Sequence, residues 1–337
     1  MKIAVLAPVA WRTPPRQYGP WEQMASNLTE GLVKAGIEVS LFATGDSITL
    51  GKLDAVIAQG YEENRDQDAK VIECLHISNL MEKAGDFDLI HNHYDFLPLS
   101  YSRLIETPMI TTIHGFSSEK IIPVYQKYND HGYYVSISDS DRHPSLKYLK
   151  TVYNGIDTTA FVFNDHPQDY LLFFGRIHPD KGTAEAIQIA IQSGRKLFIA
   201  GIIQDQDYFN TRIAPFLNAD IEFLGAAGPE QRNDLLRGAS ALLHPISFEE
   251  PFGLSVAEAM LCGTPVIAYH RGSMPELIKH GKTGFLVKEM ESAVAAVAQL
   301  NTIDRKACRE WAVSRFSQER MVKDYISLYH QILSVTS

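Results

Sequence analysis

The sequence predicts an α/β protein with two Rossmann-like domains, each built on a doubly wound parallel sheet. The chain has 337 residues, which exceeds the usual size of one hydrophobic core. Short runs rich in Val, Ile, Leu and Phe alternate with amphipathic stretches, the pattern of βα units around a parallel sheet. The pattern is interrupted at 154–169, NGIDTTAFVFNDHPQD, where turn-forming residues indicate a linker.

Seven strands are expected before this linker and six after it. The first series is expected at 3–9, 38–44, 55–60, 88–93, 109–114, 133–138 and 149–154. The second is expected at 170–177, 196–202, 221–225, 241–246, 265–270 and 284–287. Helical periodicity follows from about 303 to 334. We therefore expect an N-terminal domain over 1–155, a second domain over 156–310, and a C-terminal helical segment over 311–337 that packs back toward the first domain.

Composition and charge limit the kinds of molecule that the protein is expected to bind. The formal charge is -9, and no Lys/Arg cluster is present that could neutralise several phosphates, so no nucleic acid is expected. Cys74, Cys262 and Cys308 are widely spaced and form neither a disulfide framework nor a metal motif. The apolar start at 3–11 lacks a cleavage pattern, and no run reaches the ~20 residues of a membrane span. We expect a cytoplasmic protein with a small-molecule partner, with peripheral membrane contact left open.

In open parallel sheets, ligands bind beyond the carboxyl ends of the strands, and two such sheets would place the site in a cleft between them. Several unusual residues fall at expected strand ends. They are Gly19, His93, His114, Arg176, Lys181 and the stretch EEPFGLSVAEAM at 249–260. Their shared position is the main structural argument for a site.

The stretch EEPFGLSVAEAM should begin a helix. Phe252, Gly253, Leu254 and Ser255 lie between an apolar strand and an apolar helical pattern, so their N–H groups should be free to bind a phosphate. Glu258 follows Leu254 by four residues on nearly the same helix face, while Glu250 precedes the helix. The alternative is two carboxylates near a helix dipole, each stabilising by ~0.3–1 kcal/mol. The eight-residue spacing of the two acids occurs elsewhere in the chain and is not evidence alone.

Arg176 and Lys181 follow a buried strand in FFGRIHPDKG. One planar guanidinium and one mobile ammonium suit a diphosphate. The alternative is two solvated charges at a helix start. However, positive charge near a helix N-terminus is unfavourable without an anion, which favours a binding role.

The N-terminal half offers weaker signals. Gly19 would allow close approach of a phosphate, although an ordinary loop glycine explains it almost as well. His114 ends an expected strand, and a purely structural role for this histidine is the alternative to catalysis. His91 and His93 share a strand face, but no third ligand is apparent, so we expect no metal site. No G-x-G-x-x-G dinucleotide fingerprint occurs.

Taken together, these residues resemble family 4 of the retaining glycosyltransferases, which have the GT-B architecture of two Rossmann-like domains facing across a cleft. The resemblance covers nearly the whole chain, and the last of its motifs is highly specific. Besides the glycine loop after the first strand, the matching motifs are LIHNHYD (89–95), TTIHGF (111–116), YNGID (153–157), FGRIHPDKG (174–182), FLGAAGPE (223–230) and EPFGLSVAEAMLCGTPVIA (250–268).

The resemblance implies a role for each matching residue. Arg176 and Lys181 would bind the donor diphosphate, Glu250 the hydroxyls of the donor sugar and Glu258 the ribose. The remaining implied contacts are backbone N–H groups of Leu254 and Ser255 to phosphate, Gly19 to the diphosphate, His114 beside the reacting sugar and acceptor, and Ala226 and Ala227 near the base. Pro20 and Phe116 depart from the family pattern on the N-terminal side, which puts acceptor transfer in question.

The implied activity is that of a retaining hexosyltransferase. A sugar would move from a nucleoside-diphosphate sugar to the hydroxyl of a sugar, lipid-linked or small-metabolite acceptor, with His114, Arg176, Lys181 and Glu250 as catalytic residues. Stabilisation of the leaving diphosphate by fixed positive groups requires no metal and no cofactor, and front-face attack is the preferred mechanism. The alternatives are a sugar-nucleotide epimerase or hydrolase of the same architecture, and a non-catalytic sugar-binding protein, which would be expected to carry an export signal.

Overall fold

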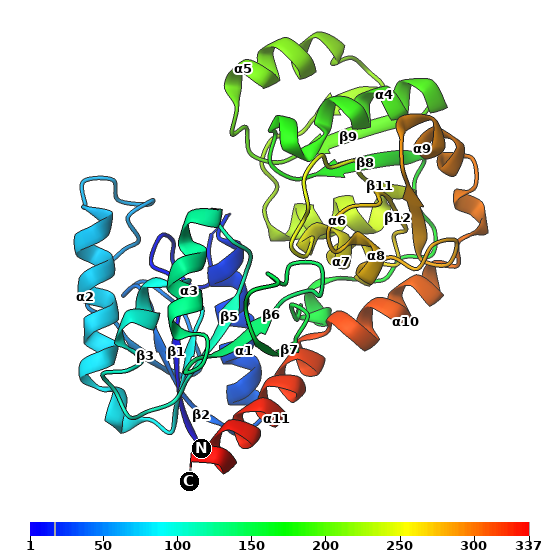
Figure 1. Cartoon of the computed structure of the whole chain (residues 1–337). Helices are drawn as coiled ribbons and strands as arrows, with labels where there is room; N and C mark the ends of the chain where they lie inside the picture. Colours follow the sequence, from blue (N-terminus) through cyan, green and yellow to red (C-terminus); the bar gives the residue numbers. More distant parts are fainter. Residues whose placement is uncertain (17, 337) are drawn as a thin grey trace. The chain divides into compact units, whose positions relative to one another are not determined.

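The computed structural model describes residues 1–16 and 18–336 and divides into two compact units. Unit 1 comprises Met1–Ile156 together with the C-terminal segment from Gln318, and unit 2 comprises Asp157–Ser317 (Figure 1). Each unit contains one open sheet in which all neighbouring strands are parallel. The expected α/β class with two doubly wound sheets is confirmed.

Unit 1 has a seven-stranded sheet in the order β3-β2-β1-β4-β5-β6-β7. Its strands are β1 (Lys2–Leu6), β2 (Glu38–Phe42), β3 (Lys52–Asp54), β4 (Leu89–Asn92), β5 (Met109–Ile113), β6 (Tyr133–Ser136) and β7 (Tyr148–Thr151). Its α-helices are α1 (Pro20–Lys34), α2 (Ala69–Glu82), α3 (Ile122–Tyr128) and α11 (Gln318–Thr336).

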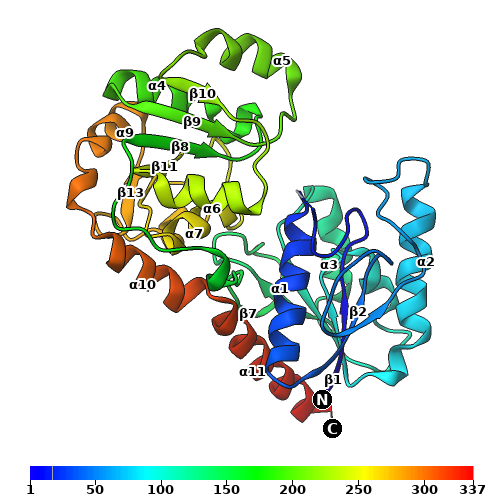
Figure 2. The ribbon, with the colours of Figure 1, turned by 180° about the vertical axis from the view of Figure 1, so that it is seen from behind.

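Alternate residues of each strand point to opposite sides of this sheet, and both sides are buried against helices. On one face, Ile3 and Val5 pack with apolar residues of α1 and α11. On the other face, Ala4 and Leu6 pack with α2 and α3. Helix α11 lies beside α1 in both views of the ribbon (Figures 1 and 2), so the last helix of the chain completes the core of the first unit.

Unit 2 has a six-stranded sheet in the order β10-β9-β8-β11-β12-β13. Its strands are β8 (Tyr170–Phe174), β9 (Lys196–Ala200), β10 (Ile221–Phe223), β11 (Ala241–His244), β12 (Val266–Tyr269) and β13 (Gly284–Val287). Its α-helices are α4 (Thr183–Ser193), α5 (Gln206–Tyr208), α6 (Pro229–Gly238), α7 (Leu254–Leu261), α8 (Met274–Leu277), α9 (Met290–Val297) and α10 (Arg305–Phe316).

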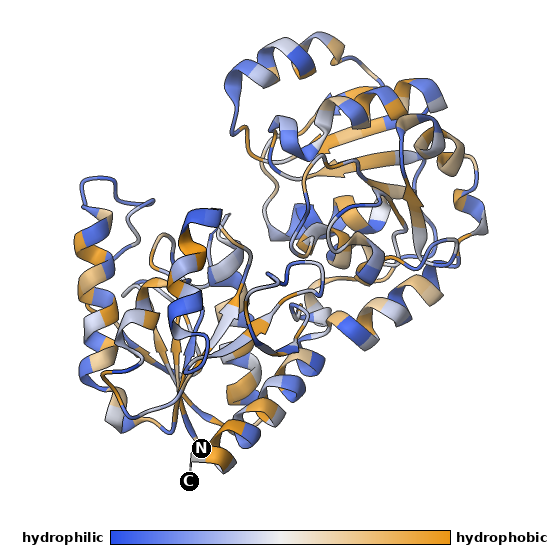
Figure 3. Cartoon of the chain, in the orientation of Figure 1, coloured by the Kyte–Doolittle hydropathy of each residue, from blue (hydrophilic) through white to orange (hydrophobic). Residues whose placement is uncertain are grey.

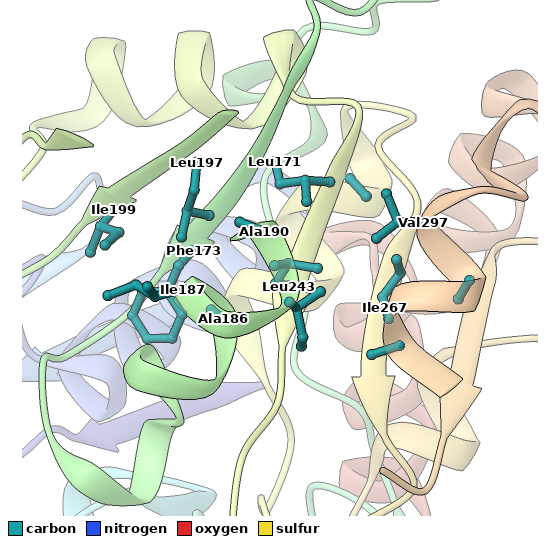
Figure 4. Close-up of a cluster of buried hydrophobic side chains, with 14 of the residues drawn as sticks. Leu171, Phe173, Ala186, Ile187, Ala190, Leu197, Ile199, Leu243, Ile267 and Val297 are labelled. Atoms are coloured by element: carbon teal, nitrogen blue, oxygen red, sulfur yellow. The ribbon is translucent and has the colours of Figure 1, made fainter. Parts of the chain in front are cut away.

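The core of unit 2 is a layer of aliphatic side chains between the sheet and helices α4 and α9. Leu171 and Phe173 of β8 pack against Ala186, Ile187 and Ala190 of α4 (Figure 4). The hydropathy colouring shows the same division, with apolar strands inside and polar residues on the outward faces of the helices (Figure 3). Among the described helices, none is long and apolar enough to cross a membrane.

The prediction of a strand at 55–60 is wrong. The third strand is Lys52–Asp54, and 55–60 lies outside it, with bends at 56–59. Its amide and carbonyl groups bond to loops instead of a sheet neighbour, as when Gly45 N–H donates to Ile57 O at 2.7 Å. Gly60 packs so closely on Ala10 that a Cβ would lie 2.3 Å from the Ala10 oxygen. Each of the other expected strands overlaps an observed one.

The helical periodicity expected over 303–334 is present but is divided between two helices. Helix α10 ends at Phe316, and α11 begins at Gln318. Ser317 has an extended backbone, with φ -73° and ψ 151°. Gln318 N–H then donates to Ile156 O at 2.9 Å, so the start of α11 is fixed to the last residue of the first segment of unit 1.

Candidate functional site

The sheet topology of unit 2 singles out one pair of loops. The chain order reverses between the neighbouring strands β8 and β11, which makes this the point where loops diverge and ligands bind in doubly wound sheets. The loop after β8 carries Arg176 and Lys181. The loop after β11 carries Glu250 and leads into α7. Residues that the sequence placed at separate strand ends therefore meet at one topological switch point.

Lys181 and Glu250 form a direct ion pair across this switch point. Lys181 Nζ lies 2.5 Å from Glu250 Oε2, and the two side chains are 16% and 14% exposed. The ammonium also lies 4.5 Å from the centre of the Phe248 ring. Glu249 is different, since its side chain is 70% exposed. The two adjacent glutamates thus differ, because Glu250 is mostly buried and Glu249 lies at the surface.

His244, the last residue of β11, completes this cluster and was missed by the sequence analysis. It is buried, and its Nε2 lies 3.7 Å from Glu250 Oε2. Burial lowers the pKa of His244 although Glu250 opposes this shift. Burial alone would raise the pKa of Glu250, but the adjacent His244 and Lys181 outweigh it and lower the pKa to about 2. Glu250 is therefore a carboxylate at neutral pH. The sequence signal that could have identified His244 is its place near the end of an expected strand, the same signal that singled out His114.

Backbone contacts hold the two loops together. Gly182 has φ +73°, and a Cβ on it would lie 2.0 Å from the Pro245 oxygen, so only glycine fits here. Ser247 N–H donates to Asp180 O at 2.9 Å. These contacts fix Lys181, between Asp180 and Gly182, relative to the loop that carries Glu250.

The positive charge of Arg176 is also offset by polar and acidic side chains of the protein. Its guanidinium donates to Gln204 Oε1 and lies 3.4 Å from Asp180 Oδ2. The sequence analysis expected an anionic ligand to offset Arg176 and Lys181. In the structure, Asp180 lies against Arg176 and Glu250 against Lys181.

Helix α7 begins beside the ion pair without a side-chain cap. Gly253 is its N-cap residue, with φ +90°. The N–H groups of Val256 and Ala257 both bond to Gly253 O, at 3.1 and 3.2 Å, whereas Leu254 and Ser255 are half-buried at the first turn. Phe252 is buried and anchors the loop edge-on against Phe316, with ring centres 5.7 Å apart.

Glu258 lies on α7 and pairs with a residue that the sequence analysis did not consider. Its Oε1 contacts the Arg232 guanidinium, while its Oε2 is buried without a hydrogen-bond partner in the described part of the chain. The Arg232 guanidinium carbon lies 5.8 Å from the centre of the Phe161 ring and 5.5 Å from that of Phe174. Burial lowers the pKa of Arg232 to about 10, so it remains a cation. An arginine in PEQRND gave no sequence signal, because it resembles an ordinary solvated helix charge.

Ala226 and Ala227 follow β10, the edge strand of this sheet, and are separated from β8 by β9. Ala226 is exposed and Ala227 half-buried. They share the carboxyl edge of the sheet with the other predicted residues but lie away from the switch point.

In unit 1 the corresponding switch point lies between β1 and β4. Gly19, the N-cap of α1, is buried with φ +148°. A Cβ on Gly19 would lie 2.9 Å from both Pro15 Cβ and Glu22 Oε2. Glu22 is itself buried and accepts a hydrogen bond from Trp11 N–H at 3.2 Å. Burial, with a smaller contribution from Glu63, raises the pKa of Glu22 to about 7.

His114 directly follows β5 and lies against His93, which directly follows the neighbouring strand β4. His93 Nδ1 and His114 Nε2 are 2.8 Å apart. The Trp21 ring stacks on His114 with ring centres 5.8 Å apart. Burial lowers the pKa of His114 to about 3. Among the described residues, no three His, Cys, Asp or Glu side chains gather in a way that could hold a metal ion.

Solved structures with the same architecture define the fold as GT-B. Sucrose-phosphate synthase from Thermosynechococcus elongatus superposes with a TM-score of 0.80 at 17% identity, covering 99% of this chain and 100% of that one. HepE from Anabaena superposes with a TM-score of 0.77 at 20% identity, covering 98% and 100%. Both are similar to this chain over its whole length, in both units.

The sequence comparisons identify the family. Residues 22–162 match Glycosyltransferase Family 4, and residues 158–312 match Glycosyl transferases group 1. An uncharacterized glycosyltransferase of Methanocaldococcus jannaschii is 23% identical, covering 98% of each chain. Glycogen synthase of Mycobacterium tuberculosis is 25% identical, covering 94% of this chain and 90% of its own. The protein belongs to the family 4 glycosyltransferases, as the sequence motifs predicted.

Proposed function

We propose that this glycosyltransferase moves a sugar from a nucleoside-diphosphate sugar to an acceptor hydroxyl with retention of anomeric configuration. The observation that carries the proposal is the Lys181–Glu250 ion pair beside the start of α7. A diphosphate can replace Glu250 as the partner of Lys181, and Glu250 is then free to accept hydrogen bonds from sugar hydroxyls. Such charge-assisted bonds are about twice as strong as neutral ones.

Most of the predicted residues have a role in this scheme, and His114 keeps the implied one beside the reacting sugar and acceptor. Arg176, Lys181 and the N–H groups of Leu254 and Ser255 stabilise the charge that develops on the departing diphosphate. The Oε2 of Glu258, which has no hydrogen-bond partner among the described residues, accepts a hydrogen bond from a ribose hydroxyl. The remaining assignments are Gly19 toward the diphosphate and Ala226 and Ala227 toward the base.

The proposed chemistry is a front-face substitution. The leaving phosphate departs from, and the acceptor hydroxyl attacks, the same face of the sugar, and a phosphate oxygen helps to take the hydroxyl proton. The positive groups around Lys181 supply the leaving-group stabilisation that a metal ion supplies in other sites. We therefore propose that transfer requires no metal ion.

The relatives guide the choice of substrates. HepE has been crystallised with UDP, with UDP and glucose, and with UDP-glucose, so UDP-glucose is the first donor to test. Relatives named for different acceptors are glycogen synthase, D-inositol 3-phosphate glycosyltransferase and N-acetyl-alpha-D-glucosaminyl L-malate synthase. A panel of glucan, inositol phosphate and L-malate covers the polysaccharide and small-metabolite classes, and a polyprenyl phosphate adds a lipid-linked one.

The test is release of nucleoside diphosphate from a panel of nucleotide sugars, with and without acceptor. Lys181→Ala and Glu250→Ala should reduce turnover strongly. The matched controls Lys282→Ala and Glu249→Ala, which alter exposed charges, should not. Equal turnover in all four variants would refute the site. Product analysis separates the alternatives, because an epimerase returns an altered nucleotide sugar and a hydrolase releases free sugar without an acceptor. Loss of activity with a chelator would contradict the metal-free mechanism.

A further inference from the structure

Three buried histidines meet on one face of the sheet in unit 1. His91 and His93 come from β4 and the residue after it, and His114 follows β5. They are 0%, 1% and 8% exposed, respectively. The ring centres of His91 and His93 are 4.3 Å apart, and those of His93 and His114 are 5.1 Å apart. His93 therefore lies between the other two rings.

The position of His93 is fixed from several sides. Its backbone N–H donates to Leu6 O at 2.9 Å, which extends the ladder between β4 and β1. Behind it, His91 Nδ1 lies 2.6 Å from Tyr329 Oη of α11, and His91 Nε2 lies 2.7 Å from Thr112 Oγ1. Since both nitrogens of His91 are occupied by hydroxyl groups, His91 cannot rotate without losing two hydrogen bonds. The ring of His93 is thereby held against His114.

The protons in this cluster can be assigned from the partners of each nitrogen. Burial lowers the pKa values of His91, His93 and His114, so each neutral ring carries one N–H. His93 Nε2 is buried without a partner in the described part of the chain. A buried N–H without an acceptor is rarer in proteins than an under-used acceptor. The proton of His93 therefore belongs on Nδ1, where it can be donated to His114 Nε2.

We propose that His93 is a positioning residue that fixes His114 as the tautomer protonated at Nδ1. Because His114 Nε2 accepts the hydrogen bond from His93, the single proton of the His114 ring must lie on Nδ1. His114 then offers an N–H donor rather than a basic nitrogen. Its task toward the sugar, which rests on the proposed function, is to donate a hydrogen bond to an oxygen of the donor or acceptor, not to remove a proton.

The tautomer can be measured without any substrate. The full-length protein labelled with ¹⁵N-histidine would be studied by long-range ¹H–¹⁵N correlation at pH 7, with His114→Gln used to assign the His114 signals. We expect a protonated Nδ1 and an unprotonated Nε2 for His114. In His93→Leu we expect a mixture of both tautomers. A His114 protonated at Nε2 in the native protein, or an unchanged tautomer in His93→Leu, would overturn the proposal.

Two amide substitutions separate the hydrogen bond from packing. In His93→Asn, the side-chain amide lies where Nδ1 was, whereas in His93→Gln it lies nearer the position of Nε2. Glutamine is closer to histidine in volume, so a purely structural role favours His93→Gln. The positioning role favours His93→Asn. We expect His93→Asn to keep the His114 tautomer and His93→Gln to lose it, and the reverse order would overturn the proposal.

The kinetic arm uses the same variants with the donor found by the panel above. We expect His93→Asn to retain kcat within a few-fold, and His93→Gln and His93→Leu to lose about 10- to 100-fold, as for other partners that orient a functional histidine. The KM for the donor should stay unchanged, since the contacts described above for His93 involve none of the residues assigned to the diphosphate. Equal losses in His93→Asn and His93→Gln would overturn the positioning role. Absence of transfer in the native protein would refute the proposed function, while the NMR result would still decide the tautomer.

Discussion

Lys181 Nζ and Glu250 Oε2 lie 2.5 Å apart although the two residues are 69 positions apart in the chain. They come from the loops after the adjacent central strands β8 and β11. The cation assigned to the donor diphosphate is thus paired with the carboxylate assigned to the donor sugar. In the proposed function, a bound donor supplies a new partner to each of these two residues.

A double-mutant cycle tests the strength of this pair. Lys181→Met should lower the free energy of unfolding by about 3 kcal/mol, because it leaves Glu250 buried without its cation. Glu250→Gln should also destabilise the protein, whereas the double variant should be less destabilised than the sum of the two. Urea unfolding at pH 7 measures all three. Additive effects would show that the two side chains do not interact in solution.

Glu22 should make stability fall as the pH rises. Its pKa of about 7 in the folded protein is above the 4.5 of an unperturbed glutamate. Between these values the unfolded state ionises while the folded state stays protonated, so the free energy of unfolding decreases from pH 4.5 to 7. Glu22→Gln should be more stable than the native protein at pH 8, by up to about 3 kcal/mol. At pH 4 the two should be equal, and a gain of the same size at both pH values would contradict this origin.

Gly182 and Gly194 form a matched pair for substitution. Both have left-handed backbones, with φ +73° and +63°, but a Cβ on Gly182 meets Pro245 O at 2.0 Å, while one on Gly194 meets none of the described residues within 4 Å. Gly194→Ala should cost about 1 kcal/mol for the backbone conformation alone. Gly182→Ala should cost at least ~2 kcal/mol more and should reduce donor turnover, because it displaces Lys181. Chemical denaturation and the donor assay would reveal this difference, and equal costs would contradict it.

Arg305 should be a major contributor to the stability of unit 2. Its buried guanidinium donates to the carbonyl oxygens of Asn164, Arg237 and Ala239 and to Thr264 Oγ1, at 2.7 to 3.0 Å. Arg305→Met leaves these acceptors without their donor and should lower the free energy of unfolding by about 3 kcal/mol. The adjacent, exposed Lys306→Met should change it by less than ~0.5 kcal/mol. Similar values for the two variants in urea unfolding would disprove the role of Arg305.

The sequence predicted the positions of the strands well and the partners of the site residues poorly. Apolar runs and turn signals located the ends of β8 and β11, and sheet topology then brought Arg176, Lys181 and Glu250 to one edge. The ion pair itself depends on side-chain directions in two loops, which no local pattern encodes. Arg232 is the clearest case, since only the fold reveals that it lies near two aromatic rings and contacts Glu258.

The strand wrongly predicted at 55–60 and the unpredicted contact of His93 with His114 have the same origin. Both depend on contacts between segments that are distant in the sequence, which local patterns do not encode. In AVIAQG, Ile57 is buried but Val56 is 46% exposed, because the segment covers loops rather than joining the sheet. The H-x-H pattern of His91 and His93 correctly indicated a shared strand face. The partner of His93 is His114, which directly follows the neighbouring strand and is 21 residues away in the chain, and periodicity gives no information about this pairing.

The route of the chain has a consequence for the order of folding during synthesis. Helix α11 supplies Tyr325, Leu328, Tyr329 and Ile332 to the core of unit 1, yet it follows every residue of unit 2 in the chain. Unit 2 can complete its fold on the ribosome as soon as Ser317 has emerged, whereas unit 1, translated first, must wait with one apolar face of its sheet incompletely covered. The first unit to be made is therefore the last to be finished, and during that interval it is the part of the nascent chain most exposed to aggregation.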